Sequence, residues 1–596
     1  MSNRTPLRPL ARILEARRRG ENPDAIEREN IRLRHEEQRD RDRQRAEGRL
    51  LTLGVFFICV FALVGVRMGM LANSEAAEPR AAASGAAILA QRADIVDRNG
   101  RLLATNLATH SLYAQPPMMI DKARSARELV KIFPDLNEEW LLRQFSGDLK
   151  FLWVRRKISP EQVQMVHDIG DPGLLFGPRE MRLYPNGRLA AHVLGGSSFG
   201  REGVHSAEVI GVAGVERVFD DYLRDPANGG APLQLSLDLT VQSTVAEVLN
   251  GGMRMMNARG AAAVLMDVHS GEVISMVSLP DFDPNNRPNP PTSGTPADSP
   301  LFNRAVQGVY ELGSVFKIFA IAQAMDAGLI NASTKIDTTS PMTWGRHRIR
   351  DYRNYGPELT ATEVIVKSSN VGTARVALQL GGTRQREFLT KLGLTEPTPV
   401  ELTEAPNAKP LLPRNWSDIS TMTISYGHGL SASPLHLAAA YATMVNGGTK
   451  VSPTLIKQNH VARGERVISE RTSRTVTDML RAVVSRGTAS FGDVPGYAVA
   501  GKTGTADKPR TNGGGYYDDK VLATFASVFP ATDPRYVLIV TLDEPSENSG
   551  REPRRTAGWT AVPVAAEVIR RTAPLLGLRP ETEALELDLI TLTANR

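Results

Sequence analysis

The stretch Glu311-Leu-Gly-Ser-Val-Phe-Lys317, which continues as IFAIAQAMDAG up to Gly328, decides how the rest of the chain is interpreted. Its apolar, proline-free second half predicts a helix, with Ser314 near the N-terminus, where free backbone N–H groups favour negative charge. A spacing of three residues stacks Lys317 on Ser314 along one helix face. A desolvated, neutral lysine amine can take the proton of a serine hydroxyl and make it nucleophilic. The pair therefore indicates a nucleophile and its base, with a helix cap beside a surface lysine as the alternative.

Two further short motifs follow. Ser368-Ser-Asn370 comes after an expected helix at residues 360–367, and Lys502-Thr-Gly-Thr505 comes after an alternating run at residues 497–500 that predicts a strand ending at the lysine. A polar turn and a simple strand end are the alternatives, and Ser546-Glu-Asn548 also matches the first pattern. Lysine is scarce here, with 14 Lys against 57 Arg. The three motifs in this order are therefore far more specific than any one of them.

A membrane anchor is predicted near the N-terminus. Residues 50–66 (LLTLGVFFICVFALVGV) carry no charge, and with the apolar residues that follow Arg67 they form about 33 Å of helix, enough for a bilayer core of ~30 Å. Seven arginines in residues 32–49 against two in residues 67–84 place the N-terminus in the cytoplasm and residues 73–596 outside. A buried helix of a soluble domain and a cleaved signal peptide are the alternatives.

Composition excludes several classes of protein. Apolar residues make up 41% and charged residues 23%, so the chain is neither wholly disordered nor fibrous. One cysteine, Cys59, excludes a disulfide framework, and ten scattered histidines lack ligand spacing, so we expect no metal and no cofactor. The first 49 residues carry a net +4 of the total +6, which leaves the body near neutral. No nucleic-acid partner is expected.

The order of elements predicts an α+β fold. Strands at residues 261–267 and 272–278 and at residues 522–529 and 536–542 have short connections, so each pair must be antiparallel. The predicted parts are a cytoplasmic Arg-rich tail (1–48), a transmembrane helix (49–71), an Ala-rich linker (72–90), a mixed α/β pedestal (91–228), a domain with an antiparallel sheet flanked by helices (229–576) and a C-terminal tail (577–596). Asp97-Arg-Asn-Gly100 predicts a hairpin turn, and residues 286–300 and 507–519 predict loops.

The ordered motifs resemble those of the penicillin-binding protein and serine β-lactamase superfamily. Longer segments look like class B penicillin-binding proteins, which are membrane-anchored, monofunctional transpeptidases, and most of all like their cell-division members. These segments are residues 92–104, 182–195, 211–216, 303–304 and 426–448. Leu312 departs from the family, which often has proline there. The resemblance implies a pedestal of the dimerisation type and a transpeptidase domain like that of a serine β-lactamase.

The resemblance also implies roles for the first two motifs. Ser314 would attack the D-Ala–D-Ala bond of a stem peptide, and Lys317 would accept its proton. Ser368 would relay protons to the leaving and attacking amines. Asn370 would hold the donor peptide and the lysine.

The third motif is implied to bind substrate. Lys502 would lower the pKa of Lys317 and attract the terminal carboxylate. Thr503 and Thr505 would also bind this carboxylate, and Gly504 would be part of the same substrate-binding strand. The N–H groups of Ser314 and Thr505 would form the oxyanion hole. That strand could pair with an extended peptide.

The implied partners are peptidoglycan stem peptides (a D-Ala-D-Ala donor and an amine acceptor), β-lactam antibiotics, and divisome membrane proteins including a lipid II glycan polymerase of the FtsW type. The expected location is the bacterial inner membrane, with the catalytic domain in the periplasm at the septum. No Glu-x-x-Leu-Asn lies between Asn370 and Lys502, which favours cross-linking over β-lactam hydrolysis.

Other functions remain as alternatives. An elongation-specific class B transpeptidase would carry the same motifs, and a non-catalytic scaffold or β-lactam sensor could share the fold. Residues 496–503 also match the phosphate-loop pattern of an ATPase. A phosphate loop opens directly into a helix, whereas Gly504 and Pro509 follow here, so the nucleotide reading is disfavoured.

Overall fold

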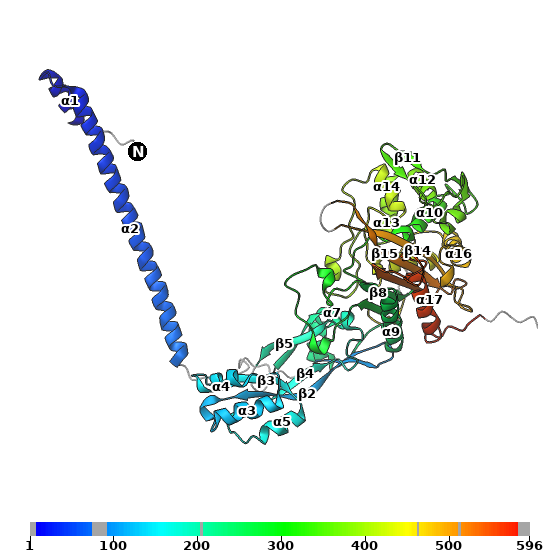
Figure 1. The fold of residues 1–596 in the computed structure, drawn as a ribbon, viewed down its shortest axis with the longest axis horizontal. Helices are drawn as coiled ribbons and strands as arrows, with labels where there is room; N and C mark the ends of the chain where they lie inside the picture. Colours follow the sequence, from blue (N-terminus) through cyan, green and yellow to red (C-terminus); the bar gives the residue numbers. More distant parts are fainter. Residues whose placement is uncertain (1–7, 74–91, 203–206, 462–463, 511–513, 582–596) are drawn as a thin grey trace, which may run out of the picture.

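The computed structural model describes residues 8–73, 92–202, 207–461, 464–510 and 514–581. A long N-terminal helix, an elongated pedestal and a larger domain follow one another along the chain (Figure 1). Helix α1 (Arg8–Arg18) packs against α2 (Pro23–Asn73), a continuous helix of 51 residues. Among the described residues, α2 holds the one segment long and apolar enough to cross a membrane. The predicted linker falls almost wholly in residues 74–91, outside the described part.

The pedestal is built on the long strand β2 (Leu102–Ala114). β2 pairs antiparallel with β1 (Ile95–Val96), β3 (Leu152–Ile158) and β4 (Leu174–Leu183), and β7 (Leu233–Gln234) adds to β1 in parallel. The helices α3 (Lys122–Ile132), α4 (Glu138–Ser146) and α5 (Pro160–His167) share a small core with this sheet. Gly100 has φ +82° in the turn between β1 and β2, which confirms the predicted hairpin.

A buried ion cluster lies where the pedestal meets the larger domain. Arg92 Nε lies 2.7 Å from Glu216 Oε2, and Arg182 Nε lies 2.7 Å from Glu216 Oε1. Arg92 Nη1 also donates to Asp220 Oδ1 at 2.7 Å. The side chains of Arg92, Arg182 and Glu216 are 2%, 1% and 0% exposed. Three segments distant in the sequence are thus joined by charge-assisted hydrogen bonds.

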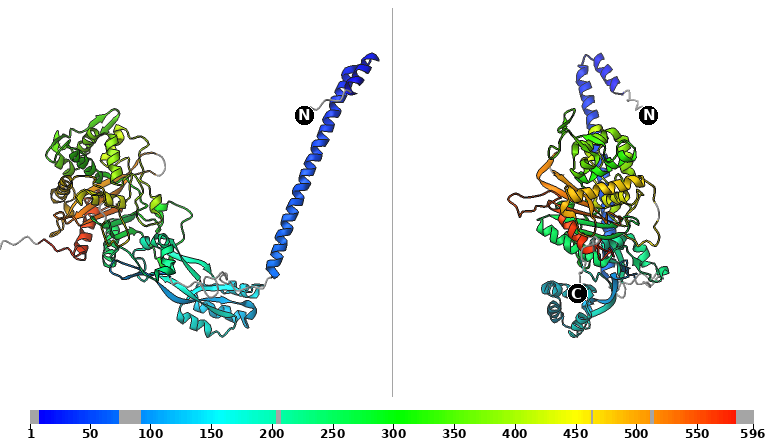
Figure 2. Two further views of the ribbon diagram at one scale, coloured as in Figure 1. Left: turned by 180° about the vertical axis from the view of Figure 1, so that it is seen from behind. Right: turned by 90° about the vertical axis from the view of Figure 1, so that its right-hand side faces the viewer.

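The larger domain contains a five-stranded antiparallel sheet in the order β14-β15-β16-β8-β9. Its strands are β8 (Gly260–Asp267), β9 (Val273–Leu279), β14 (Ala500–Pro509), β15 (Tyr516–Phe529) and β16 (Tyr536–Asp543). Helices α9 (Leu239–Met255) and α17 (Ala561–Thr572) pack together on this sheet, and α15 (Pro434–Val445) and α16 (Glu470–Arg486) form a second packed pair (Figures 1 and 2). Every residue of β16 is buried, as expected for a central strand covered on both faces.

Most smaller elements lie between β9 and α15. They are the 3₁₀ turn η5 (Gly313–Phe316), the helices α10 (Lys317–Asp326), α11 (Ala361–Val366), α12 (Asn370–Leu380), α13 (Gly382–Lys391) and α14 (Asp418–Ser425), and the strand pairs β10 (Lys335–Asp337) with β13 (Glu358–Thr360) and β11 (Met342–Trp344) with β12 (His347–Ile349). At the junction with the pedestal lie α6 (Ala191–Leu194), β5 (Gly196–Glu202), β6 (Ala207–Ala213), α7 (Gly214–Val218) and α8 (Asp220–Arg224).

The structure corrects two local expectations. The strand that carries Lys502 begins at Ala500 and runs through the motif, whereas residues 497–500 were expected to form a strand ending there. Ala498 has φ +41° in the turn that precedes β14, so the apolar alternation there does not reflect an extended strand. The Gly-rich stretch 507–519 is also not a simple loop, because β14 extends through Pro509 and β15 begins at Tyr516.

Candidate active site

The structure brings four of the predicted residues into one hydrogen-bonded cluster. Ser314 lies in the turn η5, Lys317 is the first residue of α10, Ser368 lies between α11 and α12, and Lys502 lies on β14. Lys317 Nζ is 2.9 Å from Ser314 Oγ and 3.0 Å from Ser368 Oγ. Lys502 Nζ is 3.0 Å from the same Ser368 Oγ. One hydroxyl therefore bridges two amines, and one of these amines touches the candidate nucleophile.

Burial determines the protonation of the two lysines. Lys317 is 1% exposed and Lys502 is 0% exposed. Burial, followed by the charge of Lys502, holds the pKa of Lys317 well below its usual value, although the carboxylate of Asp351 opposes this shift. Burial also lowers the pKa of Lys502 to about 7. These effects favour the neutral form of Lys317, whose lone pair can take the Ser314 proton.

Ser368 is held in an unusual backbone conformation. Its φ of +63° lies in the left-handed region, which costs a non-glycine residue on the order of 1 kcal/mol. The next residue, Ser369, caps α12, and its hydroxyl donates to Asp351 Oδ2 at 2.7 Å. Asp351 Oδ1 accepts from the backbone N–H groups of Asn370 and Val371 at 2.5 and 3.0 Å. These bonds fix the turn that aims the Ser368 hydroxyl at the two lysines.

Asp351 is a site residue that the sequence analysis did not identify. It lies in an Arg-rich loop after β12, and no motif spacing relates it to Ser314 or Ser368. An aspartate among arginines ordinarily indicates a solvated surface loop. Only the chain fold, which brings this loop to the N-terminus of α12, reveals its contact with the Ser368 turn.

Asn370 lies beside the cluster, and its side chain has a different partner from the one expected. Its Nδ2 donates to the backbone oxygen of Arg350 at 2.9 Å. Among the hydrogen bonds of the described residues, none joins its amide to Lys317. Its expected contact with the lysine is therefore absent from this arrangement, although the residue remains next to Ser368 in the same turn.

The Ser314 turn and β14 meet through their backbones. β14 is an edge strand of the sheet. A Cβ placed on Gly504 would lie 2.2 Å from the Leu312 oxygen, and one placed on Gly313 (φ +62°) would lie 2.7 Å from the Thr505 oxygen. A Cβ on Gly427 would lie only 1.9 Å from the Gly313 oxygen. Glycine at these positions lets the segments that carry the N–H groups of Ser314 and Thr505 adjoin each other.

The threonines of the third motif are oriented by their neighbours. Thr503 Oγ1 lies 2.7 Å from Thr488 Oγ1. Thr505 Oγ1 accepts from the backbone N–H of Ala557 at 3.0 Å. Because a hydroxyl that accepts such a bond keeps its own proton, Thr505 can still donate to a bound anion.

Glu311 connects the Ser314 turn to two neighbouring segments. Its Oε1 accepts from the Gly429 N–H at 2.7 Å, and its Oε2 accepts from the Tyr516 hydroxyl at 2.9 Å. His428 Nδ1 lies 3.3 Å from Oε2. Hydrogen bonds from the imidazole of His428 and from Gly429 lower the pKa of this carboxyl against the opposing effect of burial, which is the largest single influence. The carboxylate thus ties the turn to the start of β15.

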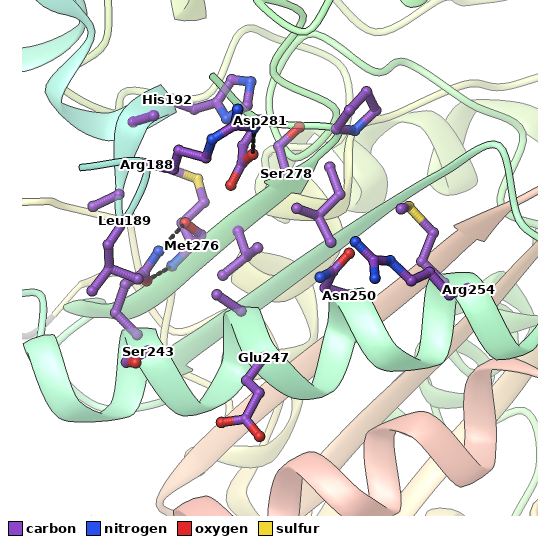
Figure 3. A pocket seen from close by; sticks show the side chains of 18 residues that line it. Arg188, Leu189, His192, Ser243, Glu247, Asn250, Arg254, Met276, Ser278 and Asp281 are labelled. Atoms are coloured by element: carbon purple, nitrogen blue, oxygen red, sulfur yellow. Dashed lines mark hydrogen bonds and ion pairs between the residues drawn. The ribbon is translucent and has the colours of Figure 1, made fainter. Parts of the chain in front are cut away.

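A large cavity of about 740 Å³ lies away from this cluster, between α9, β9 and residues 188–192 (Figure 3). Arg188 pairs with Asp281 at its rim, and the amide of Gln242 bonds to the backbone of Met276 on the edge strand β9. Its walls contain no residue of the three motifs. The described residues also contain no group of three or more His, Cys, Asp or Glu that could hold a metal ion.

Comparison with known proteins assigns both domains. Residues 261–569 match the penicillin binding protein transpeptidase domain, and residues 87–230 match the penicillin-binding protein dimerisation domain. The probable peptidoglycan D,D-transpeptidase FtsI of Caulobacter vibrioides is 36% identical over 90% of each chain. FtsI of Escherichia coli is 29% identical over 82% of this chain and 84% of its own. The crystal structure of penicillin binding protein 3 from Mycobacterium tuberculosis in complex with aztreonam has a TM-score of 0.62 at 26% identity, covering 83% of this chain and 98% of the other.

Proposed function

Because the chain belongs to the class B penicillin-binding proteins, which are peptidoglycan D,D-transpeptidases, we propose that Ser314 is the nucleophile that cross-links stem peptides in this protein. The observation that carries the assignment is the position of Lys317 Nζ, 2.9 Å from Ser314 Oγ and 3.0 Å from Ser368 Oγ. A buried, neutral amine at that position can both take and return the proton of the reaction.

In the first half-reaction, Ser314 Oγ attacks the carbonyl carbon between the two D-alanines, and its proton passes to Lys317 Nζ. The backbone N–H groups of Ser314 and Thr505 stabilise the oxyanion. The C–N bond then breaks, and the proton reaches the departing amine through Ser368. This step leaves an ester on Ser314 and releases D-alanine.

In the second half-reaction, an amine of another stem peptide attacks the ester carbon. The new C–N bond forms as the C–O bond to Ser314 breaks, and the proton of the amine returns to Ser314 through Ser368 and Lys317. Asn370 holds the donor peptide in both steps. Exclusion of water from the ester makes the product a cross-link rather than a hydrolysed peptide.

The donor peptide lies along β14. As an edge strand, β14 has unpaired backbone groups that an extended peptide can bind by strand addition. Lys502 and the hydroxyls of Thr503 and Thr505 bind the terminal carboxylate, and Gly504 lets this strand lie against the Ser314 turn, where a Cβ would be 2.2 Å from the Leu312 oxygen. Since Lys502 has a pKa of about 7, a bound carboxylate favours its charged form.

The cellular setting is part of the proposal. The arginine excess before residue 50 supports an inner-membrane protein with a cytoplasmic N-terminus and residues 73–596 in the periplasm. Relatives named FtsI support a septal role. Divisome membrane proteins, including a glycan polymerase of the FtsW type, are then the partners. We propose that the pedestal comprises residues 91–228 and that the transpeptidase domain comprises residues 229–576.

Labelling with a fluorescent penicillin tests the chemistry on the full chain in detergent. We expect one label per wild-type molecule and none on Ser314→Ala at equal thermal stability. Label that survives in Ser314→Ala would place the nucleophile elsewhere. Imaging a fluorescent fusion tests the setting: a band at the division site is expected, and a dispersed sidewall pattern would assign the protein to elongation.

A further inference from the structure

Two exposed aromatic rings and one arginine form a small platform beside the third motif. The guanidinium carbon of Arg554 lies 4.0 Å from the centroid of the Trp559 ring, and the Phe491 ring lies 5.0 Å from the same ring. Phe491 is 55% exposed and Trp559 is 41% exposed. Large aromatic side chains grouped on a surface next to a reactive centre indicate a contact with a ligand rather than core packing.

The platform adjoins the threonines assigned to the donor carboxylate. Phe491 follows Thr488, whose hydroxyl contacts Thr503, and Trp559 follows Ala557, whose N–H binds the Thr505 hydroxyl. The two loops also touch each other, because a Cβ on Gly558 would lie 2.9 Å from the Thr488 oxygen. The platform therefore borders the carboxylate-binding end of the site.

The guanidinium of Arg554 is held in place but not hydrogen-bonded. It forms an ion pair with Glu547, in which Nη1 lies 3.7 Å from Oε2, beyond hydrogen-bond distance. Within the part of the chain that the structure describes, no hydrogen bond is made by its side-chain N–H groups. Stacking on Trp559 fixes the plane of the guanidinium, and its N–H groups, which form an ion pair with Glu547 but no hydrogen bond, can bind a ligand carboxylate through two parallel hydrogen bonds.

We propose that Arg554, stacked on Trp559, binds a carboxylate of the acceptor stem peptide. The inference rests on the proposed function. Lys502, Thr503 and Thr505 already account for the donor carboxylate, and that carboxylate leaves with D-alanine before the second half-reaction. By microscopic reversibility, the attacking amine enters where the leaving D-alanine departed, beside the threonines that the platform adjoins.

The contact between Arg554 and the acceptor does not change which bonds form and break in the second half-reaction. The acceptor nitrogen forms a bond to the ester carbon, the bond from that carbon to Ser314 Oγ breaks, and the proton of the amine passes to Ser314. Arg554 touches only the non-reacting part of the acceptor. Its contribution is orientation, so it acts on the competition between amine and water for the ester.

The partition of the acyl-enzyme provides the test. Full-length protein in detergent is given a D-alanyl thioester donor and a stem tripeptide acceptor, either with free carboxylates or with those carboxylates amidated. The measured quantity is the ratio of aminolysis to hydrolysis, which does not depend on the rate of acylation. In wild type we expect the free acid to give a ratio roughly three- to tenfold higher than the amide. In Arg554→Gln we expect the two acceptors to give equal ratios, and in Arg554→Lys an intermediate preference.

Arg551→Gln is the matched control, since it removes the same charge from the same loop at an exposed position. We expect it to keep the wild-type preference for the free acid. An Arg554→Gln protein that retains this preference, or an equal loss in Arg551→Gln, would overturn the inference. Absence of any thioester turnover by wild type would instead count against the proposed function, so the two failures are distinguishable.

Discussion

Two regions of the molecule each bury two basic side chains. One is the junction between the pedestal and the larger domain, and the other is the active-site cluster of the larger domain. The two regions stabilise these side chains in opposite ways. Arg92 and Arg182 are almost completely buried, and each hydrogen-bonds the carboxylate of Glu216. Lys317 and Lys502 are buried as deeply, but among the described residues neither forms an ion pair. Arginine keeps its charge at any accessible pH and must be paired, whereas lysine can lose its proton instead.

The difference separates a structural use of buried charge from a chemical one. At the junction, the paired charges join three distant segments and leave nothing reactive. In the catalytic domain, burial without an ion-pair partner lowers the pKa of Lys317 and favours the neutral amine, which can accept a proton. Substitutions at the junction should therefore lower stability and spare activity. Substitutions of the buried lysines should lower activity and spare stability.

Lys317→Met should produce the largest effect. It removes the proposed base while keeping an unbranched chain of similar length, so we expect acylation by a labelled penicillin to slow by about 10⁴-fold. Stability should be unchanged or higher, because a buried polar group is lost from the core. Stopped-flow labelling and thermal unfolding measure the two quantities. A large fall in melting temperature would mean that Lys317 is structural, as the arginines at the junction are.

Glu216→Gln should show the opposite pattern. It removes the carboxylate that pairs with Arg182 and leaves Arg92 with Asp220 alone, and we expect the free energy of unfolding to fall by about 3 kcal/mol. Urea unfolding measures this change, and folded protein should still react with penicillin. Glu470→Gln is the control: it removes an exposed i, i+4 pair with Arg474 and should cost at most about 0.5 kcal/mol. Equal losses in both variants would remove the distinction between buried and exposed pairs.

The pH dependence of acylation should separate the two lysines. In the proposed mechanism Lys502 acts in its charged form, so the second-order acylation rate should fall as the pH rises through its pKa of about 7. In the proposed mechanism Lys317 acts in its neutral form, so its titration should produce an acid limb. In Lys502→Arg the alkaline limb should disappear, because arginine stays charged. An alkaline limb at the same pH in that variant would assign it to another group.

Asp351→Asn should produce the smallest effect. The neutral amide holds the Ser368 turn less firmly, and we expect acylation to slow by about five- to tenfold. Its carboxylate raises the pKa of Lys317, so the acid limb should move to lower pH as the plateau falls. Asp418→Asn, at an exposed position in the first turn of α14, should change neither. An unchanged acid limb would show that Asp351 acts on the turn alone.

Sequence reasoning was most successful where local pattern and chemistry agree. The residues of the hairpins β8–β9 and β15–β16 alternate or run apolar between clear turns, and the strands occur close to where they were expected. Lys317 meets Ser314 as the spacing of three residues predicts, although Ser314 lies in the 3₁₀ turn that precedes α10. The meeting of Ser314, Ser368 and Lys502 was expected from the order of the motifs rather than from any local signal.

What could not be predicted depends on tertiary contacts. The Lys502 strand begins at Ala500 because it pairs with β15 from Val528 onward, a register that residues 497–500 do not encode. Asp351 gains its role only when its loop reaches α12. The amide of Asn370 turns to Arg350 for the same reason, since the backbone oxygen it binds is supplied by that loop.

The glycines at the Ser314 turn limit how a cell could acquire resistance. Replacing Gly427 or Gly504 would force a side chain to within 1.9 or 2.2 Å of the backbone oxygens of Gly313 and Leu312, so mutations there would cost the enzyme its own turn. We therefore expect substitutions that confer resistance to arise at other positions. An inhibitor that mainly contacts the backbone around these glycines would bind the part of the site that is least able to change.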